Sequence, residues 1–375
     1  MKIGFVHDWL ATWGGSEQVL EAALEIYAPA PIHTLVYKPE IFTGTLISQQ
    51  EVHTSFIQQL PGSRRNHRIY LPLMPLAIEQ FDMGGYEVIL SDSHAVAHGV
   101  LPSAEQIHIN YIHVPARYAW HLHHEYLRDA GLERGLRSWM TRVIMHYFRL
   151  WDLGAANRVD HFVANSEWIA RNVWRAYRRP AEVIYPPVDV DQFQPLNPRE
   201  DYYITIARLV PYKRIDLIVE AFSNLPYPLK IVGTGPDLKR LTKHAPSNIE
   251  FMGWQSDDDL RELLGRAKAF VYAAVEDFGI TPVEAQAAGC PVIAYGKGGV
   301  CETVLHGRTG ILYQEQTFPS LAKAVREFEK TGNSFQITEI CENAGRFNKA
   351  RFKRELSEFV ERKWSEFQET GEGRD

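Results

Sequence analysis

Two glutamates stand eight residues apart in the stretch EDFGITPVEAQAAGCPVIA, which covers residues 276 to 294. Glu276 follows the apolar run AFVYAA, which predicts a short buried strand, and it lies in a loop that contains Gly279. Ligands of open α/β sheets bind at the carboxyl ends of strands. Free backbone N–H groups near a helix N-terminus favour phosphate or sugar oxygens at the same place. The stretch therefore predicts a ligand-binding loop.

The residues after this loop predict a short helix followed by a strand. We expect Thr281 to be the N-cap and Pro282 the first helical residue, where the missing N–H costs nothing. Glu284 stands three residues after Thr281, so the pair fits a capping box. Gly289 is expected to end the helix in a left-handed conformation, and Pro291 cannot continue it. Glu284 thus has a structural interpretation beside the functional one.

A basic pair occurs in the stretch ARLVPYKRID. Arg208 and Lys213 follow the predicted strand YYITIARL and stand near its carboxyl end. A forked guanidinium together with an ammonium group is suited to hold a diphosphate. Solvated surface charge is the alternative explanation of such a pair.

A pair of glycines in the stretch WGGSEQ is a second candidate phosphate loop. Gly14 and Gly15 follow the first predicted strand and precede a predicted helix with Ser16 as its N-cap. The stretch lacks the G-x-G-x-x-G pattern of dinucleotide-binding proteins, which argues against an NAD-dependent oxidoreductase.

Alternating strands and helices are predicted to position these residues. The alternation runs through the first part of the chain, stops at the proline-rich segment VIYPPVDVDQFQPLNPRE, and then starts again. Alternation of this kind indicates parallel sheets, and its restart indicates two domains. We predict an α/β fold of two doubly wound, Rossmann-like domains, residues 1–186 and 187–352. A last helix within about 353–375 is free to pack on either domain.

Composition limits the class of protein. The chain has 375 residues, 45% of them hydrophobic and 23% charged, as in an ordinary globular protein. A net charge of −6 gives no reason to expect a nucleic-acid partner. Three cysteines without metal-binding spacing suit a reducing compartment. No apolar run approaches the length of about 18 residues that a membrane span needs, and we expect a cytoplasmic protein.

Together these segments resemble the family 4 glycosyltransferases, retaining enzymes of the group 1 type with the GT-B fold, in which two Rossmann-like domains face a cleft. The resemblance covers nearly the whole chain. Its most specific part is the Glu-x7-Glu block from Glu276 to Glu284 with the tail GCPVI. It also includes the stretches GGSE, VANSEWIARNV, VIYPPVD, ARLVPYKRIDLIVEAF and IVGTGP.

The resemblance implies a role for each matching residue. Glu276 would hold hydroxyl groups of the donor sugar, and Glu284 would hold the ribose hydroxyls. Arg208 and Lys213 would bind the diphosphate. The remaining donor-binding positions would be the loop of Gly14 and Gly15, the backbone N–H groups of Phe278, Gly279, Ile280 and Thr281, and the segment of Met252 and Gly253 near the base.

A histidine completes the implied site. His113, in the stretch YIHVP, matches the histidine that family members place beside the donor sugar. Without the resemblance, a single histidine after a strand is more often a structural residue.

The implied chemistry is transfer of a hexose from a nucleotide diphosphate sugar with retention of configuration. The cations would stabilise the leaving diphosphate, and the acceptor would attack on the face that the diphosphate leaves. No cofactor and no metal are expected. Asp189 and Asp191 have the spacing of a manganese motif, but they lie in the proline-rich linker.

The donor and acceptor stay open at this point. A UDP-hexose such as UDP-glucose is the first choice, because uridine donors are common in the family, and GDP-mannose for a mannosyltransferase is the alternative. The acceptor would be a glycan or a lipid-linked glycan in polysaccharide synthesis. The rival functions are a phosphorylase or epimerase on the same architecture, and a non-catalytic nucleotide-sugar-binding component of a polysaccharide assembly complex.

A basic and aromatic stretch falls outside the predicted site. Residues 128–179 contain ten arginines against five acidic residues. Trp139, Val143, Tyr147 and Trp151 are spaced to share one stripe of a helix. Core packing is the first explanation of the stripe. The alternative is a surface that meets anionic lipid, which would make the protein peripheral on the inner face of the plasma membrane.

Overall fold

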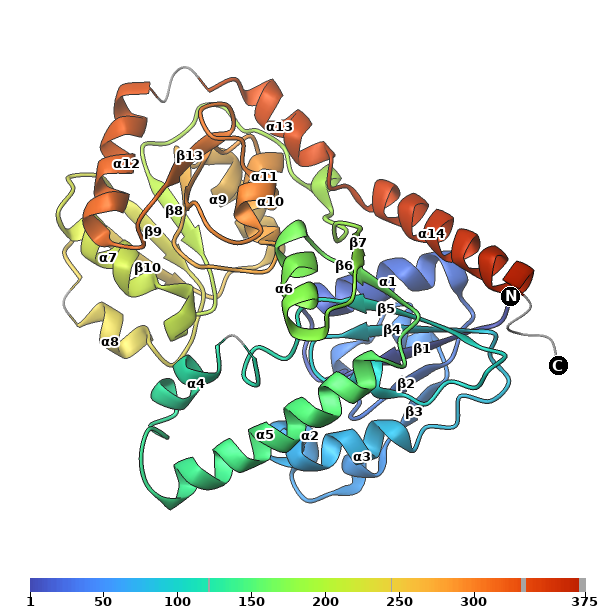
Figure 1. The fold of residues 1–375 in the computed structure, drawn as a ribbon. Helices are drawn as coiled ribbons and strands as arrows, with labels where there is room; N and C mark the ends of the chain where they lie inside the picture. Colours follow the sequence, from blue (N-terminus) through green and yellow to red (C-terminus); the bar gives the residue numbers. More distant parts are fainter. Residues whose placement is uncertain (121, 244, 332–334, 371–375) are drawn as a thin grey trace. The chain divides into compact units, whose positions relative to one another are not determined.

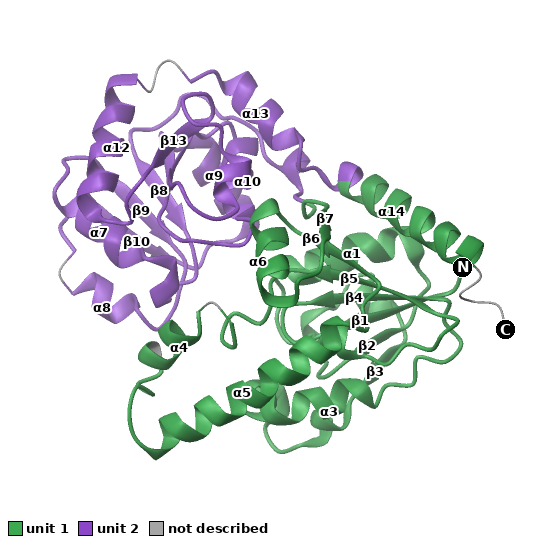
Figure 2. Ribbon diagram, viewed as in Figure 1, with its two compact units in different colours: residues 1–187, 352–375 green, residues 188–351 purple. Residues whose placement is uncertain are grey.

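The computed structural model describes residues 1–120, 122–243, 245–331 and 335–370, which form two α/β units (Figures 1 and 2). Unit 1 contains residues 1–187 and 352–375, and unit 2 contains residues 188–351. The chain passes from unit 1 to unit 2 within the proline-rich segment. Each unit is built around one parallel sheet, so the predicted fold class is confirmed.

Unit 1 has a seven-stranded parallel sheet in the order β3-β2-β1-β4-β5-β6-β7. Successive residues of β1 point to opposite faces of this sheet, as the period of a strand requires. Phe5 therefore packs into the core on one face, and Val6 packs into the core on the other. The strands are β1 Ile3–His7, β2 Ile32–Thr34, β3 Val52–Thr54, β4 Val88–Ser93, β5 Ile107–Ile112, β6 His161–Ala164 and β7 Ala181–Val183.

Helices cover both faces of the unit 1 sheet. Helix α1 (Gly15–Tyr27) buries its apolar side in the same core as Phe352, Leu356 and Val360 of α14 (Lys349–Thr370). The predicted C-terminal helix thus packs on unit 1, while residues 371–375 of its expected range lie outside the described residues. The other face carries α3 Met74–Glu79, α5 Leu136–Ala156 and α6 Glu167–Tyr177 (Figure 1). The unit also contains the short helices α2 Ser63–Asn66 and α4 His123–Asp129.

Unit 2 has a six-stranded parallel sheet in the order β10-β9-β8-β11-β12-β13. Helices α7 and α12 bury Phe222 and Phe328 in the core on one face. Helix α10 buries Ala285 on the other face, and its C-cap residue Ala288 packs into the same core. The strands are β8 Tyr203–Ile206, β9 Leu229–Val232, β10 Ile249–Gly253, β11 Ala269–Tyr272, β12 Val292–Tyr295 and β13 Gly310–Tyr313. The helices are α7 Ile215–Ser223, α8 Leu238–Thr242, α9 Asp257–Arg266, α10 Ile280–Ala287, α11 Val300–Thr303, α12 Phe318–Thr331 and α13 Ile337–Gly345.

The strand order of each sheet marks where a ligand is expected. In unit 1 the chain builds β1 to β3 in one direction and then returns to place β4 on the other side of β1. In unit 2 the same reversal separates β8 from β11. Ligands of doubly wound sheets bind at the carboxyl ends of the strands at such a reversal. Gly14 and Gly15 follow β1, Arg208 and Lys213 follow β8, and Glu276 follows β11, so these candidate residues lie at the two reversals. Met252 and Gly253 instead end β10, at the edge of the unit 2 sheet.

Candidate functional site

The loop after β11 leads directly into α10 through a glycine. Gly279 has φ 91° and is the N-cap of α10, which begins at Ile280. The predicted capping box is therefore wrong: Thr281 lies inside the first turn, and no side chain caps the helix. Glycine adopts this left-handed conformation without steric cost, so Gly279 can serve as the N-cap. The predicted end of the helix is confirmed, because Gly289 has φ 68°.

Two glycines that the site prediction missed hold this loop in place. The Gly299 amide donates to the Glu276 carbonyl at 2.9 Å. A Cβ atom on Gly299 would lie 2.4 Å from the carbonyl oxygen of Asp277, and one on Gly298 would lie 2.5 Å from that of Glu276. Only glycine permits such a close approach of two backbones. The pair was visible in the sequence as KGG, which follows strand β12.

Glu276 and Lys213 lie together in unit 2. The Lys213 ammonium donates to Glu276 Oε1, and the Tyr272 hydroxyl donates to Glu276 Oε2. Burial, followed by the charge of Glu276, raises the pKa of Tyr272 well above its usual value, so the phenol stays a donor. Lys213 has three N–H donors, of which this ion pair uses one. Both members of the pair are partly exposed, so a ligand can reach them.

Arg208 and Glu284 differ from Glu276 and Lys213 in that their side chains are unpaired within the described residues. Arg208 is exposed in the loop after β8, and its side chain has no hydrogen-bond or ion-pair partner among the described residues. Within the same part of the chain, the half-buried Glu284 carboxylate also lacks one. Burial raises the pKa of Glu284 to about 7, and the charges of Asp257 and Asp189 add to the effect. The structure thus joins Glu276 to Lys213 but leaves Arg208 and Glu284 open to a ligand.

The segment predicted near the base ends strand β10. Met252 is partly buried, and Gly253 has φ 71°, which turns the chain sharply. The next residue, Trp254, is 76% exposed. An exposed indole beside a left-handed glycine is a flat surface on which a ring can stack. The prediction for this segment did not single out Trp254.

The glycine pair of unit 1 begins helix α1. Gly14 is the N-cap, in an extended conformation, and Gly15 is the first helical residue. The predicted Ser16 cap is wrong, because the Ser16 hydroxyl donates to Glu17 Oε2 at 3.0 Å instead. Glycine at the N-cap is itself a favourable cap, so the helix does not need the serine.

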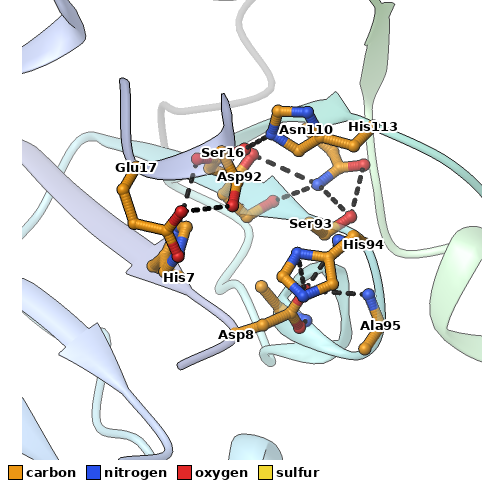
Figure 3. Close-up of polar contacts among 12 residues, drawn as sticks. His7, Asp8, Ser16, Glu17, Asp92, Ser93, His94, Ala95, Asn110 and His113 are labelled. Carbon is orange, nitrogen blue, oxygen red and sulfur yellow. Dashed lines mark hydrogen bonds and ion pairs between the residues drawn. The ribbon is translucent and has the colours of Figure 1, made fainter. Parts of the chain in front are cut away.

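His113 ends a chain of charged side chains that reaches back to α1 (Figure 3). Its Nε2 contacts Asp92 Oδ1, and Asp92 Oδ2 lies 3.1 Å from His7 Nδ1. His7 Nε2 then lies 3.5 Å from Glu17 Oε1. These residues come from the carboxyl ends of β1, β4 and β5 and from the first turn of α1. We call His113, Asp92, His7 and Glu17 the charge chain.

The charge chain is almost completely buried, and burial alone disfavours every charge in it. Burial lowers the pKa of His7, but hydrogen bonds and charges from Asp92 and Glu17 outweigh it and raise that pKa to about 10. Burial raises the pKa of Asp92, but the charge and hydrogen bond of His113, then those of His7, hold it well below its usual range. His7 therefore lies as a cation between two carboxylates.

A neighbouring carboxylate holds the loop after β4. Asp8 accepts the backbone N–H groups of His94, Ala95, Val96 and Ala97 at 2.6 to 2.8 Å (Figure 3). It also lies 3.2 Å from His94 Nδ1. Of Asp8 and the residues of the charge chain, only His113 is among those predicted from the sequence. The signal for the others was charged residues inside and directly after apolar strands, where a lone charge would be costly.

The basic and aromatic stretch is helix α5, and core packing does not explain its stripe. Trp151 packs into the unit 1 core, but Trp139 is 63% exposed and Tyr147 is 66% exposed. The helix faces the core with other residues, among them Met145 and Phe148. The stripe at i+4 spacing drifts around the helix, because four residues exceed one turn of 3.6.

Two further features are absent from the residues that the structure describes. Over that part of the chain, no helix combines the length and apolar character that a membrane span needs. Among the same residues, no three histidine, cysteine, aspartate or glutamate side chains gather as a metal site requires.

Comparison with known proteins gives two family matches. Residues 14–192 match the family described as Glycosyltransferase Family 4, and residues 189–349 match the family described as Glycosyl transferases group 1. Together the two matches span both units.

Curated relatives match parts of the chain. A GDP-mannose-dependent alpha-(1-6)-phosphatidylinositol monomannoside mannosyltransferase of Mycobacterium tuberculosis is 33% identical over 176 residues, covering 39% of this chain and 46% of the relative. The alpha-1,3/1,6-mannosyltransferase alg-2 of Neurospora crassa is 25% identical over 298 residues, covering 62% of this chain and 63% of the relative. The chain thus spans about half to just under two thirds of the length of these relatives.

Solved structures match over nearly the whole chain and show its fold. Anabaena HepE, in complex with UDP and glucose, has a TM-score of 0.68 at 18% identity, with 96% of this chain and 99% of that chain covered. Sucrose-phosphate synthase of Thermosynechococcus elongatus has a TM-score of 0.73 at 15% identity, with 97% and 100% covered. Two parallel-sheet units and two consecutive family matches agree: this chain belongs to the GT-B glycosyltransferases, with a family 4 domain in its first half and a group 1 domain in its second.

Proposed function

We propose that this glycosyltransferase is a retaining, metal-independent enzyme that moves a hexose from a nucleotide diphosphate sugar to a glycan or lipid-linked glycan acceptor. The observation that carries the proposal is the group at the carboxyl end of β11 and the start of α10. There, Lys213 and Tyr272 hold Glu276, while the Glu284 carboxylate has no partner among the described residues and a raised pKa. Carboxylate oxygens accept hydrogen bonds from hydroxyl groups, so Glu276 and Glu284 suit a ligand rich in hydroxyl groups.

Each donor group would have its own protein partner. Glu284 accepts hydrogen bonds from the ribose, and Glu276 accepts them from the hexose. Arg208 and the free N–H groups of Lys213 bind the diphosphate. The N–H groups of Phe278, Gly279, Ile280 and Thr281 at the start of α10, and the loop of Gly14 and Gly15, supply further donors to phosphate and sugar oxygens. Met252 and Gly253 contact the base, and His113 lies beside the hexose.

The transfer would use these groups for charge stabilisation. The bond between the anomeric carbon and the diphosphate oxygen breaks, and its electron pair stays on the diphosphate. The acceptor oxygen attacks the same face of the sugar, and its proton passes to the departing diphosphate. Arg208 and Lys213 stabilise the charge that develops on that leaving group. No carboxylate nucleophile is required.

UDP-glucose and GDP-mannose are the two candidate donors, and the curated relatives favour GDP-mannose. UDP-glucose is supported by HepE, which was solved with UDP and glucose, but at 18% identity. GDP-mannose is supported by the mannosyltransferase of Mycobacterium tuberculosis at 33% identity. We therefore propose GDP-mannose as the donor and keep UDP-glucose as the direct alternative.

Thermal shifts with UDP, GDP, ADP and NAD at equal concentrations test the proposal. A ligand at one hundred times its dissociation constant stabilises the protein by about 2.7 kcal/mol, which is a measurable shift. We expect a shift with GDP that Glu284→Ala and Arg208→Ala remove, while the exposed Arg326→Ala on α12 retains it. A shift with UDP alone would favour UDP-glucose over GDP-mannose as the donor. No shift with GDP or UDP, or a shift with NAD alone, would refute the nucleotide-sugar site.

A peripheral membrane contact is a second part of the proposal. The exposed side chains Trp139, Tyr147 and Leu150 of α5 lie on the same helix as several arginines, within the basic stretch. Exposed aromatic and basic groups on one helix favour anionic lipid surfaces. We expect the protein to sediment with anionic vesicles at low salt and to stay in the supernatant with neutral vesicles. The double variant Trp139→Ser/Tyr147→Ser should no longer sediment with anionic vesicles. Protein that stays in the supernatant with anionic vesicles would refute the contact and the inner-membrane location that depends on it.

A further inference from the structure

The charge chain of unit 1 is continuous over four side chains. Nε2 of His113 contacts Asp92, Asp92 lies 3.1 Å from His7, and His7 lies 3.5 Å from Glu17 (Figure 3). At its other end, Glu17 Oε2 would lie 3.3 Å from a Cβ atom on Gly14. The chain therefore runs from the histidine proposed beside the hexose to the glycine loop proposed beside the diphosphate.

The charge chain is most buried at His7 and most exposed at His113. The His7 side chain is 0% exposed, those of Asp92 and Glu17 are 4% exposed, and that of His113 is 13% exposed. Burying an ion costs several kcal/mol unless its partners have good geometry. The fold could fill these positions with apolar side chains at no such cost. A row of buried charges that opens at His113 therefore suits a role at His113.

The chemistry of the chain fixes the orientation of His113. An ionised carboxylate only accepts hydrogen bonds, so the Nε2 atom that contacts Asp92 must carry a proton. His7 supports that ionised state from the other side of Asp92, and Glu17 in turn balances His7. The Nδ1 atom of His113 has no hydrogen-bond partner within the described residues. It is the atom of His113 left to contact a ligand.

We propose that Asp92, His7 and Glu17 are positioning residues that hold the imidazole of His113 toward the hexose of the donor. The proposal rests on the nucleotide-sugar function above. Glu17 has a second consequence, because its carboxylate lies close to the glycine loop. His7 balances this negative charge, so that it does not repel a diphosphate bound by Gly14 and Gly15.

The test compares two affinities in the same protein. The nucleotide alone and the matching nucleotide sugar, GDP with GDP-mannose and UDP with UDP-glucose, are titrated calorimetrically into the wild type and variants. In Asp92→Asn we expect the affinity for the nucleotide sugar to fall about ten-fold, because a charge-assisted hydrogen bond that orients His113 is lost. The affinity for the nucleotide alone should change by less than about two-fold, because the nucleotide lacks the hexose. His7→Gln should show the same pattern as Asp92→Asn, a lower affinity for the nucleotide sugar and a nearly unchanged affinity for the nucleotide alone.

Further variants separate positioning from a general loss of structure. Glu17→Gln acts at the far end and keeps the size of the side chain, so it serves if Asp92→Asn does not fold; we expect a fall of about three-fold. In the double variant Asp92→Asn/His113→Ala, the loss of affinity for the nucleotide sugar should not exceed that of His113→Ala alone. Both changes remove the same interaction, because Asp92 acts through His113.

A matched control comes from the same unit. Asp152 is a buried carboxylate that lies 3.2 Å from His98 Nε2 and accepts the Trp120 Nε1–H at 2.7 Å. Asp152→Asn should lower stability without changing the ratio of the two affinities. If the wild type binds both ligands and the ratio is unchanged in Asp92→Asn, His7→Gln and Glu17→Gln, the positioning role is wrong and the proposed function stands. If the wild type binds neither, both are wrong.

Discussion

The two units differ in where the charges of the candidate site find their partners. In unit 1, Asp92, His7 and Glu17 are buried and pair with one another. In unit 2, Arg208 is exposed and the half-buried Glu284 carboxylate has no hydrogen-bond or ion-pair partner among the described residues. One unit thus satisfies its charges internally, whereas the other leaves charges that a ligand can satisfy.

The difference separates two roles of charged residues, positioning in unit 1 and ligand binding in unit 2. Buried, paired charges hold their geometry before a ligand arrives, and this preorganisation is what transition-state stabilisation requires. Open charges supply the interaction energy itself, at a cost in the stability of the empty protein. Changes in unit 1 should therefore lower stability, and changes in unit 2 should lower function while leaving stability equal or higher.

The largest expected effect is in unit 1. Asp92→Asn removes one partner of a buried ion pair and leaves His7 with Glu17 alone, which should cost about 3–5 kcal/mol of unfolding free energy. Urea unfolding measures this loss. The exposed Asp258→Asn on α9, which removes a surface pair with Arg261, should cost less than about 0.5 kcal/mol. Equal costs for the two variants would show that the charge chain does not stabilise unit 1.

The second effect is in unit 2 and concerns rate. Arg208→Ala should lower the transfer rate about 10²–10³-fold, because a cation aimed at the leaving diphosphate is lost. Since Arg208 is exposed, the unfolding free energy of the Arg208→Ala variant should stay within about 0.5 kcal/mol of the wild-type value. The control is Arg326→Ala, another exposed arginine of unit 2. A transfer rate in Arg208→Ala equal to that of this control would remove Arg208 from the site.

The same difference between the units explains what the sequence could predict. The fold was predictable because alternating strands and helices are local patterns, and each restart marks a new sheet. The unit 2 residues were predictable because Glu276, Glu284, Arg208 and Lys213 stand in recognisable segments after strands. The charge chain joins residues 7, 17, 92 and 113, so only the folded sheet brings its members together.

The wrong predictions were local ones that the backbone overrode. Gly279 and Gly14 begin their helices in place of Thr281 and Ser16, because a glycine can serve as the N-cap without a side-chain bond. For the stripe on α5, the spacing favours core packing over the alternative of a lipid-binding surface, but Trp139 and Tyr147 are exposed. Spacing identifies one side of a helix but does not say whether that side faces the protein or the solvent.

The third effect is a pH dependence of nucleotide binding in unit 2. The Glu284 carboxylate has a pKa raised to about 7 by burial and by Asp257 and Asp189, and its ionised form accepts ribose hydrogen bonds best. Nucleotide affinity should therefore fall about ten-fold from pH 8 to pH 6, as Glu284 takes up a proton. Calorimetric titration at several pH values measures this. Glu284→Gln should bind weakly and with little dependence on pH, and a wild-type affinity that is constant over this range would contradict the role of Glu284.

The smallest effect has the opposite sign to that of Asp92→Asn and gives the sharpest contrast between the units. Burial raises the folded-state pKa of Glu284 to about 7, above the ordinary value of 4.5 for a glutamate. Its contribution to stability is therefore fully present below pH 4.5 and is lost as pH rises through 7. Above pH 7 the empty site therefore holds an ionised carboxylate that destabilises the fold. Glu284→Gln removes that charge and keeps the shape, so at pH 8 it should raise the unfolding free energy by about 1 kcal/mol, with the full shift discounted for partial exposure. At pH 4 the gain should vanish, because Glu284 is then protonated in both states. A destabilised Glu284→Gln at pH 8 would mean that this carboxylate has a structural partner, and unit 2 would then resemble unit 1.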